Sequence, residues 1–203
     1  MGISRQSLGF LDTCISECLG SVPLSSIRML ELGNQRFPTS RQPAKLYFEG
    51  KVAEHVSVDL NGKDGSLPLD LTKPELFVSW NNYFCVVTNF GCSEHVRLQY
   101  ECFQVMHSCL AVHGIMVHVL PEARLRLEKG YWKHHCSFYY YSEFFEMLAD
   151  RNGYKLVRSQ ILHKLLAVCL QKVQPLPFME DRDEFSKYIL DPAKRKALRN
   201  EQP

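Results

Sequence analysis

The sequence predicts an α/β protein with a mostly parallel sheet and an antiparallel last strand. Strand-like segments alternate with helix-like segments over residues 27–152, which is typical of parallel sheets with connecting helices. Two strand-like segments then follow each other closely, which favours an antiparallel hairpin at the end of the sheet. Because strand–helix–strand crossovers are right-handed, we expect helices on both faces of the sheet, in three layers.

The first third of the chain predicts one helix and two strands. A stripe of apolar residues that includes Leu8, Leu11 and Ile15 predicts the helix, which Gly20 ends. One short apolar run and one alternating segment predict the strands, and a short helix fits between them, near Pro43. The predicted elements are a helix over 4–20 and strands over 27–32 and 53–60.

The segment SLPLDL, residues 66–71, does not fit a simple alternation of strands and helices. Only residues 61–65 separate it from the second strand, and these carry two turn signals, Asn-Gly and Asp-Gly. A parallel crossover needs about a dozen residues or more. The segment is therefore either a hairpin partner of the second strand or an extended loop.

The rest of the chain predicts three helical segments and four strands. Ser93 is expected to cap a long helix, and Gly153 to end the last one. The predicted elements are one or two helical turns over 73–80, strands over 82–90 and 115–121, helices over 93–110 and 142–152, and hairpin strands over 154–162 and 165–173.

Length and periodicity favour one domain with additions at both ends. We expect an N-terminal helix packed on the core over residues 1–26, the main α/β domain over 27–174, and a linker with a charged tail over 175–203. The tail is compatible with a short helix around 184–190.

Composition argues against several classes of protein. A net charge of +2 argues against a protein that mainly coats nucleic acid. Asp12 and Glu17 interrupt the N-terminal apolar residues, so no signal peptide is expected, and no apolar run is long enough for a membrane span. The eight cysteines are then expected to be reduced, in a cytoplasmic protein. No two pairs have the spacing of a structural zinc site, so no metal is expected.

Polar residues follow the predicted strands, at the edge where open α/β sheets bind ligands. Asp59 ends the second strand and could accept hydrogen bonds from both hydroxyls of a ribose. Gly33 lets the backbone approach a ligand closely, and Asp70 could bind an adenine amino group. These residues would seat an adenosine-type cofactor.

Each of these residues also has a structural alternative. Asp59 and Asn89 could simply form turns, and Asp70 could cap the helical turns that follow it. Glu31 could form an ion pair with Arg28 or with the nearby Arg36.

Five segments, taken in order, resemble class I S-adenosylmethionine-dependent methyltransferases: ELGNQ, VDLNGKDG, LPLDL, VTNFGCSEHV and HGIMVHVLP. The resemblance covers roughly residues 27–172 and implies a Rossmann-like three-layer sandwich, with the hairpin as its reversed last strand. The chain departs from the family at two points. Its glycine-rich turn is degenerate, with one glycine in GNQRFP, and the helix between the second and third strands is missing.

The resemblance implies S-adenosylmethionine as the cofactor and S-adenosylhomocysteine as its product. The implied cofactor-binding residues are Glu31, Gly33, Asn34 and Gln35 at the methionine half, Asp59 and Leu60 at the ribose, Asp70 and Leu71 at the adenine, and Asn89 and Phe90 near the methyl group.

Three residues are candidate catalytic groups. Asn89 would face the methyl group, while His95 and His135 are candidate general bases, since histidine titrates near neutrality. Glu94 and His95 could instead be structural, because a carboxylate is stabilised at the start of a helix. The basic loop 124–135 could cover the site and bind an acceptor carboxylate or phosphate, or it could simply be solvated.

The predicted function is methyl transfer to an oxygen or nitrogen of a small polar acceptor, with no membrane partner. Nucleic acid or protein remains an alternative acceptor, and the sequence does not indicate an oligomeric state. The single-glycine turn motivates a different class, a catalytically inactive methyltransferase-like binding or scaffold protein. A nicotinamide-dependent oxidoreductase would carry Gly-x-Gly-x-x-Gly after the first strand, and GNQRFP lacks it.

Overall fold

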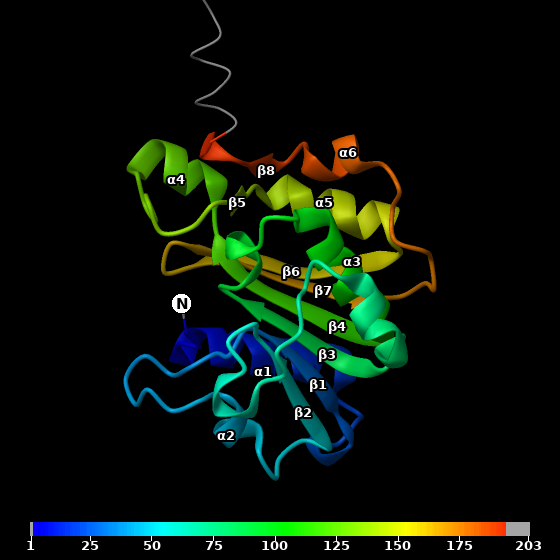
Figure 1. The fold of residues 1–203 in the computed structure, drawn as a ribbon. Coiled ribbons are helices and arrows are strands. Elements are labelled where there is room, and N and C mark those ends of the chain that lie inside the picture. The colour runs from blue at the N-terminus through cyan, green and yellow to red at the C-terminus, as the bar shows by residue number, and fades with distance from the viewer. Residues whose placement is uncertain (1, 194–203) are drawn as a thin grey trace, which may run out of the picture.

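A six-stranded sheet in the order β2-β1-β3-β4-β7-β6 runs through the molecule. The structure is a computed structural model and describes residues 2–193 (Figure 1). The predicted strands are all present, at somewhat different bounds. They are β1 (Arg28–Leu32), β2 (Glu54–Val58), β3 (Phe84–Phe90), β4 (Leu110–Pro121), β6 (Tyr154–Leu162) and β7 (Leu165–Lys172).

The first four strands of the sheet are parallel and the last two are not. β1 pairs in parallel with both β2 and β3, and β3 pairs in parallel with β4. β7 is antiparallel to β4 and to β6, which confirms the reversed end of the sheet. Because the chain leaves β1 to one side for β2 and to the other for β3, the strand order switches at β1.

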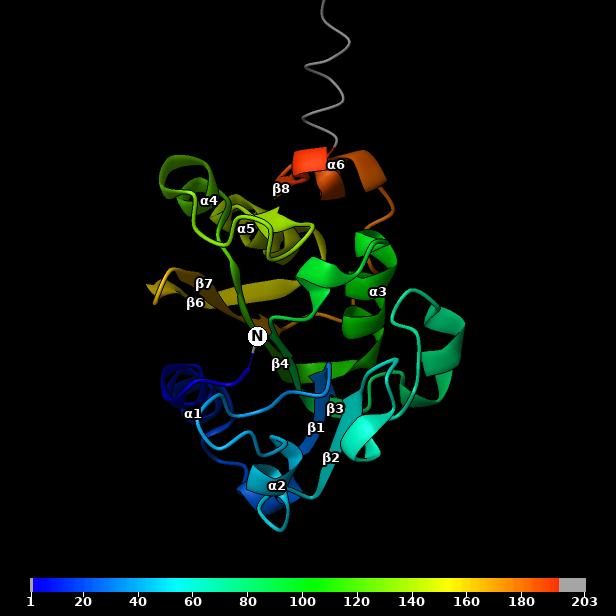
Figure 2. The same ribbon diagram turned by 60° about the vertical axis from the view of Figure 1, so that its left-hand side comes forward.

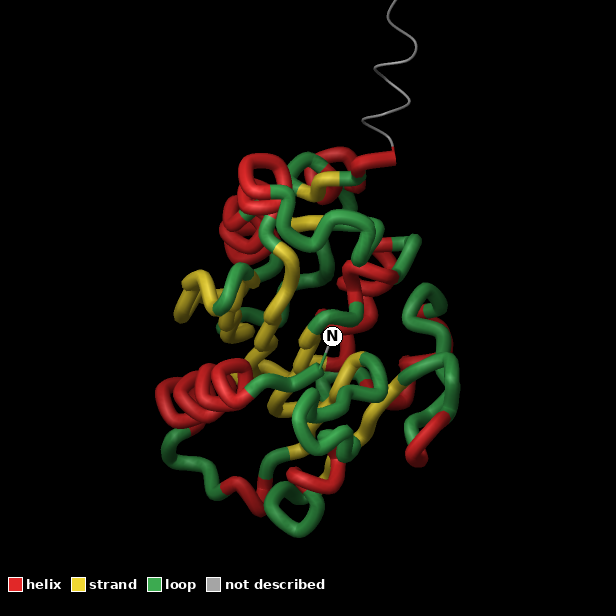
Figure 3. Tube along the Cα trace, turned by 90° about the vertical axis from the view of Figure 1, so that its left-hand side faces the viewer, coloured by secondary structure: helices red, strands yellow, loops and turns green. Residues whose placement is uncertain are grey.

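Helices cover both faces of the sheet, which confirms the three-layer arrangement. α1 (Arg5–Leu19) and α2 (Lys45–Phe48) lie on one face, while α3 (Gln99–Cys109) and α5 (Ser142–Arg151) lie on the other (Figures 2 and 3). Phe10 and Leu11 of α1 pack on the first face, and Phe103 and Phe144 pack on the second. Over residues 2–193, no helix is both long and apolar enough to cross a membrane.

The segment SLPLDL forms an extended loop, one of its two predicted alternatives. Its only strand-like contact is an isolated parallel bridge between Leu67 and Val58. The turn before it is the 3₁₀ helix Lys63–Gly65, so no α-helix connects β2 to this loop. The structure therefore lacks the helix between the second and third strands that the methyltransferase pattern contains, as the sequence indicated.

The helix predicted over 93–110 is wrong in its first turn. The chain forms the 3₁₀ helix Ser93–His95, then an irregular stretch, and α3 begins only at Gln99. Ser93 does not cap α3, because the side chain of Asn89 holds it at the end of β3: Ser93 N donates to Asn89 Oδ1 at 3.0 Å. The Gln99 side chain donates to the backbone oxygens of Ser93 and Val96, which replaces helical hydrogen bonding there.

The chain after β7 folds back over α3 and α5. Phe178, Met179 and Phe185 are buried in the same core cluster as those helices. α6 (Arg182–Ser186) lies earlier than the short helix expected around 184–190, and β8 (Ile189–Leu190) pairs with β5 (Tyr139–Tyr140). The last ten residues of the predicted charged tail, 194–203, lie outside the described residues.

Candidate functional site

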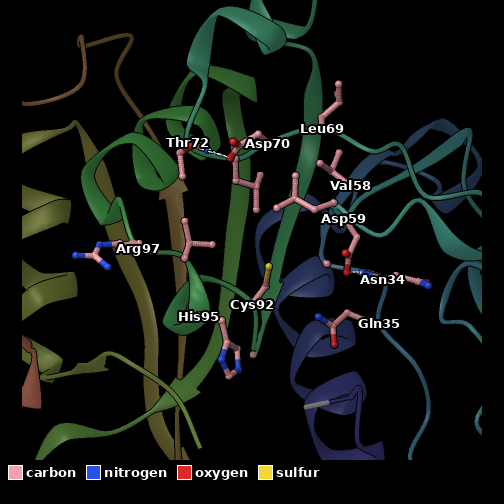
Figure 4. A pocket seen from close by; sticks show the side chains of 15 residues that line it. Asn34, Gln35, Val58, Asp59, Leu69, Asp70, Thr72, Cys92, His95 and Arg97 are labelled. Atoms are coloured by element: carbon pink, nitrogen blue, oxygen red, sulfur yellow. Dashed lines mark hydrogen bonds between the residues drawn. The ribbon is translucent and has the colours of Figure 1, made fainter. Parts of the chain in front are cut away.

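A cavity of about 550 Å³ opens at the carboxyl ends of β1, β2 and β3, at the switch in strand order. This is where open α/β sheets bind ligands, and the volume lies in the usual range for ligand pockets. Four segments line the cavity (Figure 4): Gly33–Gln35, Val58–Leu60, Leu69–Thr72 and a stretch after β3 that contributes Gly91, Cys92, His95, Val96 and Arg97.

The turn after β1 is tight and buried. Gly33 has a φ of +78°, which favours glycine, and its N donates to Val58 O at 2.8 Å. A Cβ at Gly33 would lie 2.8 Å from Gln35 Nε2, so a side chain there would displace the Gln35 amide. The single glycine of GNQRFP therefore lies in the cavity wall at a positive φ that favours glycine.

Two acceptor atoms of this turn are buried and have no hydrogen-bond partner among the residues that the structure describes. They are Asn34 Oδ1 and Gln35 Oε1, and both residues line the cavity. Their donor ends are bonded, since Asn34 Nδ2 donates to Asp64 Oδ2 and Gln35 Nε2 donates to Leu32 O. Buried acceptors are normally satisfied in native proteins, so this pair fits a ligand that brings donor groups.

Glu31 lies behind the turn rather than in the cavity wall. Its side chain is 1% exposed, and Oε1 accepts from Gln35 N at 3.0 Å. His55 Nε2 lies 3.5 Å from Glu31 Oε2. Glu31 therefore holds the Gly33–Gln35 turn in place, and it pairs with His55 instead of the arginines considered from the sequence.

Asp59 joins the turns that follow β1 and β2. Its Oδ2 accepts from Asn34 N at 2.8 Å and its Oδ1 accepts from Asn61 N at 2.9 Å. Asp59 therefore holds the turns together and also lines the cavity, so the two sequence interpretations of this residue are compatible. Leu60 also lines the cavity, although it is 70% exposed.

Asp70 and Leu71 both line the cavity, and Asp70 lies on a different side of it from Gln35 (Figure 4). Asp70 Oδ1 accepts from Thr72 N at 2.9 Å and from Thr72 Oγ1 at 2.8 Å. These hydrogen bonds, first from the backbone and then from the hydroxyl, lower the pKa of Asp70, so its carboxylate is ionised near neutrality.

Asn89 and Phe90 do not line the cavity. Asn89 is fully buried, and its Nδ2 donates to Ser93 Oγ at 2.8 Å and lies 3.2 Å from His118 Nδ1. Phe90 is buried on the opposite face of the sheet, in the cluster that packs beneath α1. Successive residues of a strand alternate between its faces, so the two side chains point into opposite layers, and neither is among the residues that line the cavity.

His95 and His135 lie next to each other at one end of the cavity. His95 lines it with a side chain that is 44% exposed, and the two imidazole centroids are 5.3 Å apart. Burial and then the neighbouring His135 lower the pKa of His95, and burial lowers the pKa of His135. Both rings are therefore neutral near pH 7 and able to accept a proton.

Glu94 lies beneath these histidines and is completely buried. Its carboxylate is 0% exposed, and neither oxygen has a hydrogen-bond partner within the described part of the chain. Burial raises the pKa of Glu94 to about 7. The sequence left Glu94 with two alternatives, a structural charge at a helix N-terminus or a residue of the site, and the helix begins only at Gln99.

The basic loop 124–135 does not form a lid, since none of its residues lines the cavity. Its first part is α4 (Ala123–Lys129), where Arg124 pairs with Glu143 and Glu122, and Arg126 lies 5.4 Å from the centre of the Tyr139 ring. Only the end of the loop, with His135, approaches the cavity, next to His95.

Sequence reasoning missed several cavity residues. Thr72, Cys92 and Arg97 line the cavity, but no pattern in the sequence distinguishes them from loop residues. The path of residues 91–97 depends on side-chain contacts of Asn89 and Gln99, so local sequence could not predict it.

Several solved structures of methyltransferases have the same architecture as this chain. The 1,6-didemethyltoxoflavin-N1-methyltransferase of Burkholderia thailandensis, solved with 1,6-didemethyltoxoflavin and S-adenosylhomocysteine, has a TM-score of 0.57 over 84% of this chain and 78% of its own, at 12% identity. The N-methyltransferase NodS of Bradyrhizobium japonicum WM9, also with S-adenosylhomocysteine, has a TM-score of 0.56 over 84% of this chain and 87% of its own, at 11% identity. The chain has a class I methyltransferase fold.

The methyltransferase fold is the limit of what these comparisons establish. An O-methyltransferase family protein of Burkholderia thailandensis matches at a TM-score of 0.55 and 11% identity, over 84% of this chain and 57% of its own. Proteins with this fold therefore carry names for transfer to nitrogen and to oxygen alike. No protein-family model matches the sequence, and no curated protein matches it.

Proposed function

We propose that this chain is an S-adenosylmethionine-dependent methyltransferase that acts on an oxygen or nitrogen of a small polar acceptor. The observation that carries the proposal is the cavity at the switch in strand order, with Asp59 at the end of β2 and two unsatisfied buried acceptors in the turn after β1. The fold adds to it, because similar structures hold S-adenosylhomocysteine.

The residues present fit the cofactor at both of its ends. Asn34 Oδ1 and Gln35 Oε1 would accept from the amino group of its methionine half, close to Gly33. Asp59 would accept from the ribose hydroxyls, since a carboxylate oxygen can accept more than one hydrogen bond. Asp70 would accept from the adenine amino group, with Leu71 as an apolar wall. Glu31 would act indirectly, by holding the turn.

When bound, the cofactor supplies an electrophilic methyl group, so the protein mainly has to position the acceptor and manage its proton. We propose that His95 accepts the proton that the methyl acceptor loses, because its neutral and partly exposed imidazole lines the cavity. His135 would keep His95 neutral through its proximity. Asn89 and Phe90 receive no role at the methyl group, because both lie behind the cavity wall.

Binding of S-adenosylhomocysteine tests the proposal directly. Isothermal titration should give a saturable site in the wild-type protein and none for NAD. Asp59→Asn removes one charged acceptor of ribose hydroxyls, and such hydrogen bonds contribute about 1.5–3 kcal/mol. The dissociation constant should therefore rise roughly 10–100-fold.

A matched control variant is available on the same surface. Glu75→Gln removes an exposed carboxylate close to the Leu69–Thr72 wall that does not line the cavity, so it should leave the affinity nearly unchanged. Equal losses in the two variants would refute the ribose assignment. If wild-type protein does not bind S-adenosylhomocysteine at all, the methyltransferase proposal fails and the inactive scaffold alternative is favoured.

A further inference from the structure

The carboxyl group of Glu94 is buried without a hydrogen-bond partner among residues 2–193. Neither of its oxygens is bonded within that range, and the side chain is 0% exposed. Placing a charged group in a protein interior without compensation costs several kcal/mol, so buried carboxylates are normally paired or bind metals. His95 Nε2 lies 3.8 Å from Glu94 Oε1, which is too long for a hydrogen bond.

Two imidazoles complete a set of metal ligands around this carboxylate. Ligand atoms of Glu94, His95 and His135 all lie within 4.8 Å of one another, and this is the one such group among residues 2–193. The donors of a tetrahedral site with bonds of about 2.0–2.1 Å lie roughly 3.4 Å apart. Small side-chain rotations would therefore bring the three donors onto one ion.

The backbone holds the two halves of this cluster together. Ser137 N and Phe138 N both donate to Glu94 O, at 3.1 and 3.2 Å. His135 N donates to Trp132 O at 3.0 Å, which closes the turn that carries this histidine. The segment after β3 and the segment before β5, about 40 residues apart in the chain, are thus fixed to each other where the ligands meet.

We propose that Glu94, His95 and His135 form a binding site for one divalent transition-metal ion, with Zn²⁺ as the best match. Two imidazoles and one carboxylate are the ligand set of a catalytic zinc site, whereas Mg²⁺ and Ca²⁺ favour oxygen donors alone. The site differs from the expectation drawn from the sequence, in which the spacing of the cysteines gave no reason to expect a metal.

The open coordination position of the ion would lie beside the cavity. Glu94 closes the inner side of the site, while both histidines are exposed and His95 lines the cavity. An ion there would bind a hydroxyl oxygen of the acceptor and ease loss of its proton, in place of direct proton transfer to the His95 imidazole, which the ion would occupy. This second step rests on the proposed function and favours an oxygen acceptor, whereas the metal site stands independently of it.

Metal binding is tested on the full-length protein, freed of metal with a chelator and without cofactor. Titration with Co²⁺ should give visible d–d absorption that saturates at one ion per chain and is reversed by Zn²⁺, while excess Mg²⁺ leaves it unchanged. Glu94→Gln and His135→Asn should each weaken Co²⁺ binding more than tenfold.

His134→Asn and Cys136→Ser are the matched controls, because they change neighbours of His135 that are not part of the cluster. Both should bind Co²⁺ like the wild type. Absorption that persists at full strength in Glu94→Gln, or that disappears in Cys136→Ser, would overturn the site. Titration of the same metal-free protein with S-adenosylhomocysteine separates this result from a failure of the proposed function.

Discussion

Acidification should destabilise this protein through His118, by an amount that follows from its burial. The imidazole is 0% exposed, stacks on Phe103 with 5.6 Å between ring centroids, and lies 3.2 Å from Asn89 Nδ2 through its Nδ1. Burial lowers the pKa of His118 from 6.5 to about 3. The native protein therefore keeps the ring neutral at pH values where the unfolded chain protonates it.

The sign and size of the effect follow from this difference. Since the pKa is lower in the folded state, the stabilisation is complete above a pH of about 6.5 and is lost as the pH falls toward about 3. Each pH unit in that window costs about 1.4 kcal/mol. Moving from about pH 8 to about pH 5 should thus lower the free energy of unfolding by about 2 kcal/mol, or the melting temperature by about 4–8 °C at this chain length.

The assay compares the wild type with His118→Phe by urea and thermal unfolding at both pH values. Because other groups titrate in the same interval, the informative quantity is the difference between the two proteins, and the variant should lose about 2 kcal/mol less on acidification. Phe10→Leu, a substitution in the core on the other face of the sheet, should cost the same at both pH values. The reasoning is refuted if His118→Phe and the wild type lose equal stability.

Two further substitutions test the turn after β1 and the end of α3. Gly33→Ala should lower the free energy of unfolding by about 1–2 kcal/mol because of its positive φ, and it should also weaken S-adenosylhomocysteine binding, since the new Cβ would lie 2.8 Å from Gln35 Nε2. The control is Gly50→Ala, at φ +71° with open space around it, which should affect stability alone. Calorimetry with and without ligand measures both effects. Lys172 is 3% exposed, and its Nζ donates to His107 O and Leu110 O, both at 3.1 Å. Lys172→Met would remove both hydrogen bonds to these buried carbonyls and should lower the free energy of unfolding in urea by about 2–3 kcal/mol. A loss below about 0.5 kcal/mol would contradict this.

The strands of this fold were predictable because their signals are local. Apolar runs predict β1 and β3, and the two residues between β6 and β7 leave room only for a tight hairpin. Those residues, His163 and Lys164, have φ values of +44° and +72°, as such a turn requires. Asp59 and Asp70 were predictable as cavity residues for a similar reason, since the ends of parallel strands meet at one edge.

The rest of the site depends on contacts between distant segments. Whether Asn89 faces the cavity or the core cannot be read from β3 alone, and its bonds to Ser93 and His118 decide the matter. The same bonds replace the first turn of the predicted helix with the 3₁₀ turn that carries Glu94. His135 lies beside His95 because Ser137 N and Phe138 N donate hydrogen bonds to Glu94 O.

The pairing of β5 with β8 ties the last described residues of the chain to the cavity wall. Ile189 pairs with Tyr140, whose hydroxyl bonds to Ser93 Oγ at 2.9 Å and to Gln99 Oε1 at 2.6 Å, on either side of His95. A truncation at residue 174 would remove β8 and the buried Phe178 and Phe185 together. Shortened versions of this protein made for crystallisation should therefore keep the chain through Leu190, because an earlier end would loosen the segment that carries Glu94 and His95.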